Sequence, residues 1–318
     1  MSRRTPILVS LLACLAALIL PAIAGAAPAP AENIGLHVGQ LRGGKATILS
    51  RVPVRGVISP FVAGERVDLL FFRNGRQVGT ETVQVRKGPG SKGKFDTRFL
   101  VRRGGRFAVQ AVHEASAGQQ GAASKREKFG VSFPGIGGGQ CGKVVRGFKR
   151  GLSKLGYVPG GGSCMSDRAE RAVLAYRKVN GKGRNQHAGK GIVKRVFAGK
   201  GKFNARHKGV GEHVEVSISK QVLVFVNKKG RPVETYHVST GKSSTPTVTG
   251  RFEVYRREPG TNSHGMVHSS YFVGGYAIHG YPSVPATYPA SHGCVRVPIP
   301  DALHIYEKIS FGEPVFVY

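Results

Sequence analysis

The pattern of apolar and polar positions along the chain changes character twice after the N-terminal region. Between residues 34 and 133 apolar residues alternate with polar ones, as in Phe107–Val112, which is typical of strands with one buried face. Apolar runs on either side of Asn74 and Gly75 predict a β-hairpin, because this dipeptide favours a tight turn between antiparallel strands. We therefore predict a β-sandwich of the immunoglobulin-like kind over 34–133, acting as a spacer or adhesion module.

A glycine-rich stretch at 134–139 leads into a segment with helical periodicity. Four apolar residues recur at the spacing of one helix face, namely Val145, Phe148, Leu152 and Leu155. Asp167 with Glu170 three residues later reads as a capping box at the start of a second helix. We predict a small helical module over 140–181. The next residues, 182–210, mix Lys and Arg with Gly and predict a basic linker.

From residue 211 to residue 318 the pattern is mainly β again. Val222–Val226 is a short apolar run of the kind found in buried strands, and several similar runs surround it. One helix is predicted over 302–309, with Asp301 as its N-terminal cap. The whole chain is therefore predicted to be multidomain and mainly β.

The N-terminus has the three-part pattern of a secretory signal peptide. Arg3 and Arg4 precede an almost wholly apolar run at 7–24, and small residues follow at 24–26. We predict a signal peptide over 1–26 and a Pro/Ala tether over 27–33, although an uncleaved membrane anchor is the alternative. No other segment is apolar enough to span a bilayer, so we expect an exported protein of the cell wall with no membrane span after cleavage.

The chain is strongly basic. It has 48 Lys and Arg against 17 Asp and Glu, a formal net charge of +31. Residues 141–210 alone contain 18 Lys and Arg and only two acids. The electrostatic field of so basic a chain favours binding of anionic polymers. Export from the cytoplasm argues against nucleic acid as that polymer. We expect possible contact with anionic wall polymers, with a solvated, flexible link over 182–208 as the alternative.

Three cysteines lie beyond the predicted signal peptide: Cys141, Cys164 and Cys294. Exported proteins tend to pair their cysteines, and one that is left over is a candidate reactive thiol. Cys141 and Cys164 flank the first predicted helix, so we predict a disulfide between them. Cys294 stands far away in sequence and is predicted to be the unpaired thiol.

Cys294 lies in a segment whose residues suit nucleophilic catalysis. His279 follows a short apolar run, so it is predicted to lie at a strand end, and Cys294 follows Gly293 at a tight turn. A thiol attacks a carbonyl as the thiolate, which a neighbouring imidazole can generate. Gly293 leaves the backbone free to present N–H groups to an oxyanion. A backbone carbonyl is the candidate acceptor that fixes the imidazole tautomer.

The paired signature Ile278–Gly280 and Ser291–Arg296 resembles that of the L,D-transpeptidase catalytic domain, the YkuD family. Gln221–Leu223, Val238–Gly241 and the stretch 245–252 support the resemblance, which extends over 211–318. The resemblance implies a C-terminal mixed β-sandwich with a Cys-His site, and no metal or other cofactor.

The resemblance also implies the reaction and the role of each residue. Cys294 would attack the carbonyl of the third residue of a peptidoglycan stem tetrapeptide and expel D-alanine, and an acceptor stem would then form a 3→3 cross-link. His279 would be the base. The other implied residues are Gly280, whose carbonyl would orient His279; His292, Gly293 and Cys294, whose amides would hold the oxyanion; and Ser291 and Arg296, which would support the site or hold a substrate carboxylate.

The helical module resembles the small peptidoglycan-binding domain found on wall enzymes. The matching pieces are Leu152–Tyr157 and Ala172–Arg177. This likeness implies a helical fold with a possible affinity for wall glycan.

Three alternative functions remain open from the sequence. An L,D-carboxypeptidase would use the same acyl-enzyme with water in place of the acceptor. A zinc peptidase or amidase could draw its ligands from His264, His268, His279, His292 and Cys294. A non-catalytic, basic wall-binding protein would also fit the first two modules.

Overall fold

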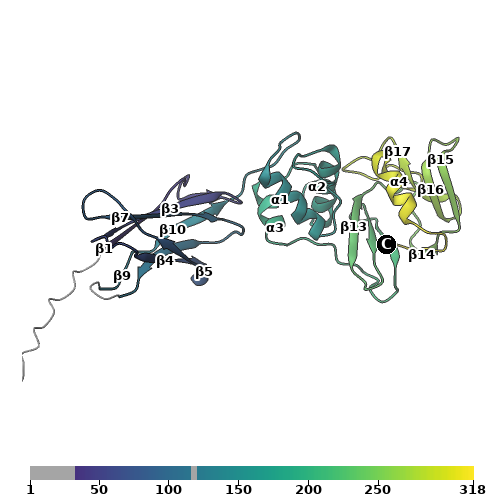
Figure 1. Ribbon diagram of the computed structural model, residues 1–318. Coiled ribbons are helices and arrows are strands. Elements are labelled where there is room, and N and C mark those ends of the chain that lie inside the picture. The colour runs from purple at the N-terminus through teal and green to yellow at the C-terminus, as the bar shows by residue number, and fades with distance from the viewer. Residues whose placement is uncertain (1–32, 116–119) are drawn as a thin grey trace, which may run out of the picture.

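The computed structural model describes residues 33–115 and 120–318 of the chain. These residues form three bodies in a row: a β-sandwich, a group of helices and a mixed β domain (Figure 1). The predicted signal peptide at 1–26 and nearly all of the predicted tether at 27–33 lie outside the described residues. Within the described residues, no helix is both long and apolar enough to cross a membrane.

The first body is a sandwich of two sheets that share one apolar core, the immunoglobulin-like arrangement predicted from the alternating pattern. Val52, Val54, Gly56 and Ile58 of one strand are buried, and the residues that alternate with them are more exposed. One sheet has the strand order β1-β3-β7-β6 and the other the order β2-β10-β8-β4-β5, with β9 beside β8. The strands are β1 (Asn33–Val38), β2 (Lys45–Thr47), β3 (Arg51–Ser59), β4 (Arg66–Arg73), β5 (Arg76–Gln84), β6 (Arg86–Lys87), β7 (Gly93–Leu100), β8 (Phe107–His113), β9 (Ala122–Ala123) and β10 (Glu127–Ser132).

Asn74 and Gly75 form the turn of the predicted hairpin between β4 and β5. Both residues have a positive φ, 51° and 84° respectively. A two-residue turn of this kind matches the right-handed twist of the strands, and Asn and Gly adopt it at the least cost. The Asn74 side chain also accepts a hydrogen bond from the Arg106 amide at 3.0 Å. The turn is thereby joined to the connection between β7 and β8.

The second body has three helices around a separate core. They are α1 (Lys143–Lys154), α2 (Asp167–Val179) and α3 (Lys190–Phe197). A disulfide joins Cys141 and Cys164 on either side of α1, and Cys294 is free. The N-terminal cap of α2 is Ser166, one residue before the predicted Asp167, because the Ser166 hydroxyl accepts from the Ala169 amide at 3.5 Å.

The predicted basic linker over 182–210 contains ordered structure that its composition does not indicate. Helix α3 lies within it, and Ile192 and Val196 are buried in the helical core. Farther along, Phe203 and Ala205 pack against the outward-facing side of the first sheet of the third body. The few apolar residues have helical or alternating spacing, but the surrounding Lys and Gly residues obscure that signal.

The third body is a mixed β domain, as predicted. A five-stranded sheet with the order β13-β12-β11-β19-β14 and a four-stranded sheet with the order β15-β16-β17-β18 enclose a largely aliphatic core. Two strand pairs are parallel, β11 with β19 and β17 with β18. The strands are β11 (His213–Ser217), β12 (Val222–Val226), β13 (Pro232–His237), β14 (Gly250–Glu253), β15 (Arg256–Thr261), β16 (Val267–Val273), β17 (Tyr276–Tyr281), β18 (Val295–Pro298) and β19 (Pro314–Val317).

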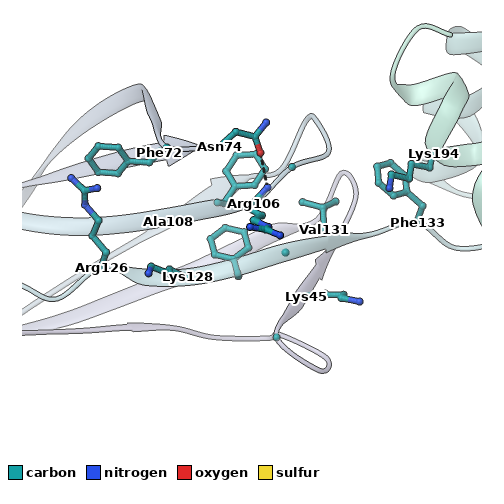
Figure 2. A pocket seen from close by; sticks show the side chains of 16 residues that line it. Lys45, Phe72, Asn74, Arg106, Ala108, Arg126, Lys128, Val131, Phe133 and Lys194 are labelled. Carbon is teal, nitrogen blue, oxygen red and sulfur yellow. Dashed lines mark hydrogen bonds between the residues drawn. The ribbon is translucent and has the colours of Figure 1, made fainter.

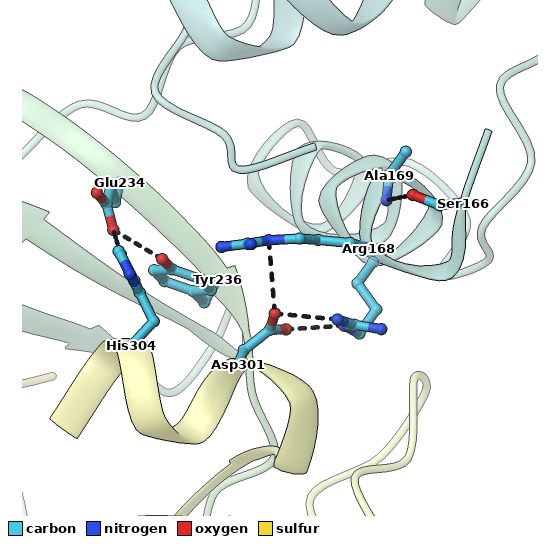
Figure 3. Close-up of polar contacts among 8 residues, drawn as sticks. Ser166, Arg168, Ala169, Glu234, Tyr236, Asp301 and His304 are labelled. Carbon is cyan, nitrogen blue, oxygen red and sulfur yellow. Dashed lines mark hydrogen bonds and ion pairs between the residues drawn. The ribbon is translucent and has the colours of Figure 1, made fainter. Parts of the chain in front are cut away.

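Helix α4 (Ile299–Lys308) packs against β16 and β17 and begins three residues before its predicted start. Pro300 is tolerated there because the first-turn amides of a helix have no partner within the helix. Asp301 therefore lies inside the first turn instead of capping it. Its carboxylate accepts two hydrogen bonds from Arg171 of α2, at 2.7 and 3.0 Å. Figure 3 shows Asp301 facing the helix that carries Arg168. The ion pair between Asp301 and Arg171 joins the helical body to the third body.

Candidate active site

Two parallel strands bring the predicted nucleophile and base to one face of the four-stranded sheet. Ile278 of β17 pairs with Val295 of β18, and both side chains are buried in the core. Side chains alternate between the faces of a sheet, so His279 and Cys294, each one residue away, point to the opposite face. Diagonal neighbours on one face lie within about 8 Å of each other. The strand register therefore predicts that the imidazole and the thiol lie near each other on this face.

The backbone of its own strand fixes the tautomer of His279. Nδ1 of His279 lies 2.9 Å from the carbonyl oxygen of Gly280. A carbonyl only accepts, so the proton is on Nδ1 and Nε2 is the free acceptor. His279 is 3% exposed. Burial lowers its pKa to about 4; the Gly280 hydrogen bond opposes this shift and the charge of Arg296 adds to it. The imidazole is therefore neutral at pH 7 and able to take a proton.

The Cys294 thiol is protonated at rest for a related reason. Burial raises the pKa of Cys294 above its ordinary value, although a hydrogen bond from the Ala277 amide and the charge of Arg296 oppose the shift. These two opposing contacts favour the thiolate once it forms. Burial thus favours the neutral form of both the Cys294 thiol and the His279 imidazole.

Ser291 organises the turn that presents Cys294. Its hydroxyl accepts a hydrogen bond from the Gly293 amide at 3.1 Å and donates to the Cys294 carbonyl. The Ser291 amide donates to the Thr240 carbonyl at 3.0 Å, which ties the turn to the neighbouring segment after β13. The Gly293 amide, one of the three amides implied for the oxyanion, is thus already engaged. The amides of His292 and Cys294 are the remaining candidates.

Two glycines at the site leave no room for a side chain. Gly293 has a φ of +119°, and a Cβ atom there would lie 2.3 Å from the ring of Tyr276. At Gly280 a Cβ would lie 2.6 Å from the Cβ of Ala302 on α4. Gly293 therefore permits the sharp turn at the nucleophile, and Gly280 lets α4 pack closely behind the strand that carries the base.

Arg296 lies beside His279 in the strand register. Its guanidinium carbon lies 4.0 Å from the centre of the Tyr281 ring, and this ring meets the His279 ring edge-on at a centroid distance of 5.7 Å. The three side chains form a continuous group on one sheet face. Tyr281 was not identified from the sequence; the signal that could have found it is its position two residues after His279, on the same face of a strand.

The five residues that could have formed a zinc site do not form a metal-binding cluster. Among the residues that the structure describes, no group of three or more His, Cys, Asp or Glu side chains could hold a metal ion. His268 lies on β16 beyond the β15–β16 turn, and its Nδ1 accepts a hydrogen bond from the Gly260 amide at 3.2 Å. The arrangement gives no support to a metal-dependent peptidase.

A large surface groove lies away from the thiol, on the sandwich and next to the helical body. It has a volume of about 1050 Å³. Figure 2 shows cationic side chains around it, with Phe72 on one side and Phe133 beside Lys194 on the other. Its cations are Lys45, Arg106, Arg126, Lys128 and Lys194, and no Asp or Glu is among the described residues that line it. This basic groove is a candidate binding surface separate from the Cys294 site.

Cys294 and His279, whose tautomer is fixed, lie at one sheet and form a candidate site for acyl transfer through a cysteine. The protein therefore belongs to the class that has such a site. The family described as the L,D-transpeptidase catalytic domain, YkuD, matches residues 211–317. A crystal structure of the L,D-transpeptidase (residues 123–326) from Xylanimonas cellulosilytica is 30% identical, with a TM-score of 0.54, and the match covers 58% of this chain and 98% of that one. The chain therefore belongs to the L,D-transpeptidase family.

A second L,D-transpeptidase structure, from Stackebrandtia nassauensis, is 22% identical with a TM-score of 0.37, over 57% of this chain and 94% of that one. A search among curated proteins gave no match.

Proposed function

We propose that this chain is an exported peptidoglycan L,D-transpeptidase that forms 3→3 cross-links in the cell wall through an acyl-enzyme on Cys294. The observation that carries the proposal is the shared sheet face of Cys294 and His279, with Nδ1 of His279 held by the Gly280 carbonyl. Membership of the family supports the substrate class, which is the stem peptide of peptidoglycan.

In the first half-reaction, Nε2 of His279 takes the thiol proton as Sγ attacks the carbonyl carbon of the third stem residue. The new S–C bond places negative charge on the former carbonyl oxygen, which the His292 and Cys294 amides stabilise. Collapse of this intermediate breaks the C–N bond to D-alanine. His279 returns its proton to the leaving amine, and a thioester remains on Cys294.

In the second half-reaction, the amine of an acceptor stem attacks the thioester carbonyl and gives its proton to His279. The C–S bond breaks, and the thiolate recovers the proton from His279. Ser291 holds the turn in place through its bonds to Gly293 and Cys294. Arg296 shapes the site through its contact with Tyr281 or holds a substrate carboxylate.

Product analysis separates this function from its alternatives. The mature protein is incubated with a disaccharide-tetrapeptide, and the products are weighed by mass spectrometry. A cross-linked dimer with release of D-alanine supports transpeptidation. A tripeptide alone identifies an L,D-carboxypeptidase, in which water replaces the acceptor. Unchanged substrate supports a non-catalytic wall-binding protein, and turnover that persists in Cys294→Ala contradicts the cysteine mechanism.

We also propose that the basic groove on the sandwich binds an anionic wall polymer. Phe72, Phe107 and Phe129 are each less than 10% exposed, and their rings line the groove. The Arg126 guanidinium lies 4.0 Å from the centre of the Phe72 ring, which restrains a cation at the groove. Cations without compensating acids attract phosphate or carboxylate groups through charge. Such binding would hold the catalytic domain close to its substrate.

A charge-matched pair of variants tests the groove. Arg126→Gln with Lys128→Gln removes two groove cations, whereas Arg51→Gln with Arg98→Gln removes two exposed cations from the other sheet. Binding of poly(glycerol phosphate) and of polyglutamate is measured by calorimetry at low and high salt. We expect the groove variant to bind more weakly and the control to bind like the unmodified protein. Equal weakening in both would mean that net charge alone attracts the polymer.

A further inference from the structure

The segment 282–290 connects the strand of the base to the turn of the nucleophile. It begins after Tyr281, which contacts the His279 ring, and ends at Ser291, which holds the Cys294 turn. Any shift of this segment is therefore transmitted to both reacting side chains. Its second half is anchored inside its own domain, because the Ser239 hydroxyl donates to Tyr288 and accepts from the Ala290 amide.

The helical body contributes a buried cation to the base of this segment. Lys178, near the end of α2, is 4% exposed. Its Nζ lies 3.0 Å from the Val238 carbonyl, 3.3 Å from the Gln221 carbonyl and 2.7 Å from Nδ1 of His237. An ammonium group has three N–H donors, so all three are satisfied by the third body. Burial, with the nearby Arg184 charge, lowers the pKa of Lys178 to about 7.

His237 connects Lys178 to segment 282–290 through its two ring nitrogens. Burial, with the nearby Lys178 charge, lowers the pKa of His237 to about 3, so its ring is neutral. Because Lys178 donates to Nδ1, the ring proton lies on Nε2, which donates to the Val284 carbonyl at 3.1 Å. Lys178 therefore selects the tautomer of His237 that binds the segment.

Arg184, just beyond α2, makes a second contact from the helical body. Its two terminal nitrogens donate to the Thr287 carbonyl at 3.0 Å and to the Ser219 carbonyl at 2.9 Å. The first acceptor is in the segment and the second is in the turn between β11 and β12. Two points of 282–290, at Val284 and Thr287, are thus tied to the module that precedes the catalytic domain.

We infer that Lys178, His237 and Arg184 are positioning residues through which the helical module holds segment 282–290, and with it the Cys294–His279 pair, in the geometry that accepts the donor stem. The inference rests on the proposed function. It gives the helical module a part in catalysis that does not depend on binding glycan.

Two readouts on the full mature chain separate positioning from intrinsic reactivity. The first is the rate of Cys294 acylation by a stem tetrapeptide, and the second is alkylation of Cys294 by iodoacetamide, which needs no positioned substrate. We expect Lys178→Met and His237→Leu to slow acylation by about tenfold or more, with alkylation unchanged. His237→Gln keeps one acceptor and one donor, so it should restore most of the acylation rate.

Arg184→Ala has a matched control in Arg177→Ala. Arg177 also donates to two backbone carbonyls, but those of Gly183 and His187 lie within the helical body. Hydrogen exchange of segment 282–290 should become faster in Arg184→Ala and Lys178→Met, and remain unchanged in Arg177→Ala.

The outcomes distinguish this inference from the proposed function. If the unmodified protein forms no acyl-enzyme, the proposed function fails. If it does, but the Lys178, His237 and Arg184 variants match it in acylation and in exchange, the inference is wrong. The inference is also wrong if the variants lose both acylation and alkylation and their melting temperature falls strongly. That pattern indicates a purely structural role.

Discussion

Burial controls the charge of both reacting side chains. His279 is neutral at pH 7 because its pKa is about 4, and Cys294 stays protonated because burial raises its pKa. A protein with a preformed thiolate–imidazolium pair would need the opposite shifts. In the proposed mechanism, the thiol proton therefore passes to His279 at the moment of attack.

This charge state predicts the pH dependence of Cys294 alkylation. Iodoacetamide reacts with the thiolate, and a raised thiol pKa means that the thiolate fraction grows about tenfold for each pH unit between 6 and 8. The rate of Cys294 alkylation, followed by intact mass, should rise in that proportion. A flat profile across this range would show a preformed ion pair and contradict the account.

Gly293 provides a steric test of the nucleophile turn. Gly293→Ala would place a Cβ against the Tyr276 ring in a backbone conformation that L residues rarely adopt. We expect kcat/KM for donor acylation to fall about 100-fold, because the thiol moves relative to its partner. Gly191→Ala on α3 is the control, since a Cβ there meets nothing within 4 Å. Similar activity in both variants would mean that the turn is not sterically fixed.

The sequence indicated some of these residues and not others. Cys294 and His279 stand in a distinctive motif, and the unpaired cysteine was suggested by the other two. Lys178 and His237 were missed, because a cation and a ring buried at a contact between modules leave no periodic signal. The only available hint was that Lys178 lies four residues after Leu174, on the same side of α2.

Helix α2 is the element that joins the modules. Arg171, in its middle, forms a two-fold hydrogen-bonded ion pair with Asp301 of α4, and Arg168 lies 4.0 Å from the same carboxylate (Figure 3). The side chain of Asp301 is 5% exposed. An isolated carboxylate at such a site is costly, so the pair is needed once the charge is buried.

Arg171→Ala should therefore lower the free energy of unfolding by about 3 kcal/mol, because it removes both hydrogen bonds to the buried Asp301 carboxylate and leaves only the more distant Arg168 beside it. Arg171→Ala with Asp301→Ala should recover part of that loss. Chemical denaturation of the four proteins of this cycle measures the coupling. A double variant no more stable than Arg171→Ala would show that the two side chains do not stabilise each other.

For strands and helices, the sequence predicted which elements are present better than it predicted where they begin and end. The strand over Val222–Val226 was predicted at its observed limits, because its apolar run ends in polar turns. Helix α4 begins earlier than predicted, since Pro300 was taken to precede the helix rather than to lie in its first turn. Helix α3 was missed because the segment around it is rich in Lys, Arg and Gly, which obscure its four apolar residues.

The β-sandwich and the L,D-transpeptidase domain lie on either side of the helices (Figure 1). Each body has its own apolar core. Alternating strands, helical spacing and the Cys-His motif led to the prediction of three modules. The contacts between the modules could not be predicted, because they join residues far apart in sequence, such as Arg184 and Thr287.

Because the β-sandwich has its own apolar core, the effect of removing it can be predicted. A protein of residues 134–318 keeps α2 and its contacts with the catalytic domain. We expect its acylation rate with a soluble stem peptide to be unchanged and its binding of poly(glycerol phosphate) to be greatly weakened. Melting curves establish that it is folded. Retained polymer binding would place the anion site outside the sandwich.

The central claim is that Cys294 carries the acyl group, and one measurement tests it most directly. The protein is incubated with a stem tetrapeptide donor, stopped with acid and analysed by intact mass and peptide mapping. The account predicts an adduct equal to the donor minus D-alanine on the peptide that contains Cys294, slow to form in His279→Ala and absent from Cys294→Ala. An adduct on another residue, or the same adduct in Cys294→Ala, would contradict it.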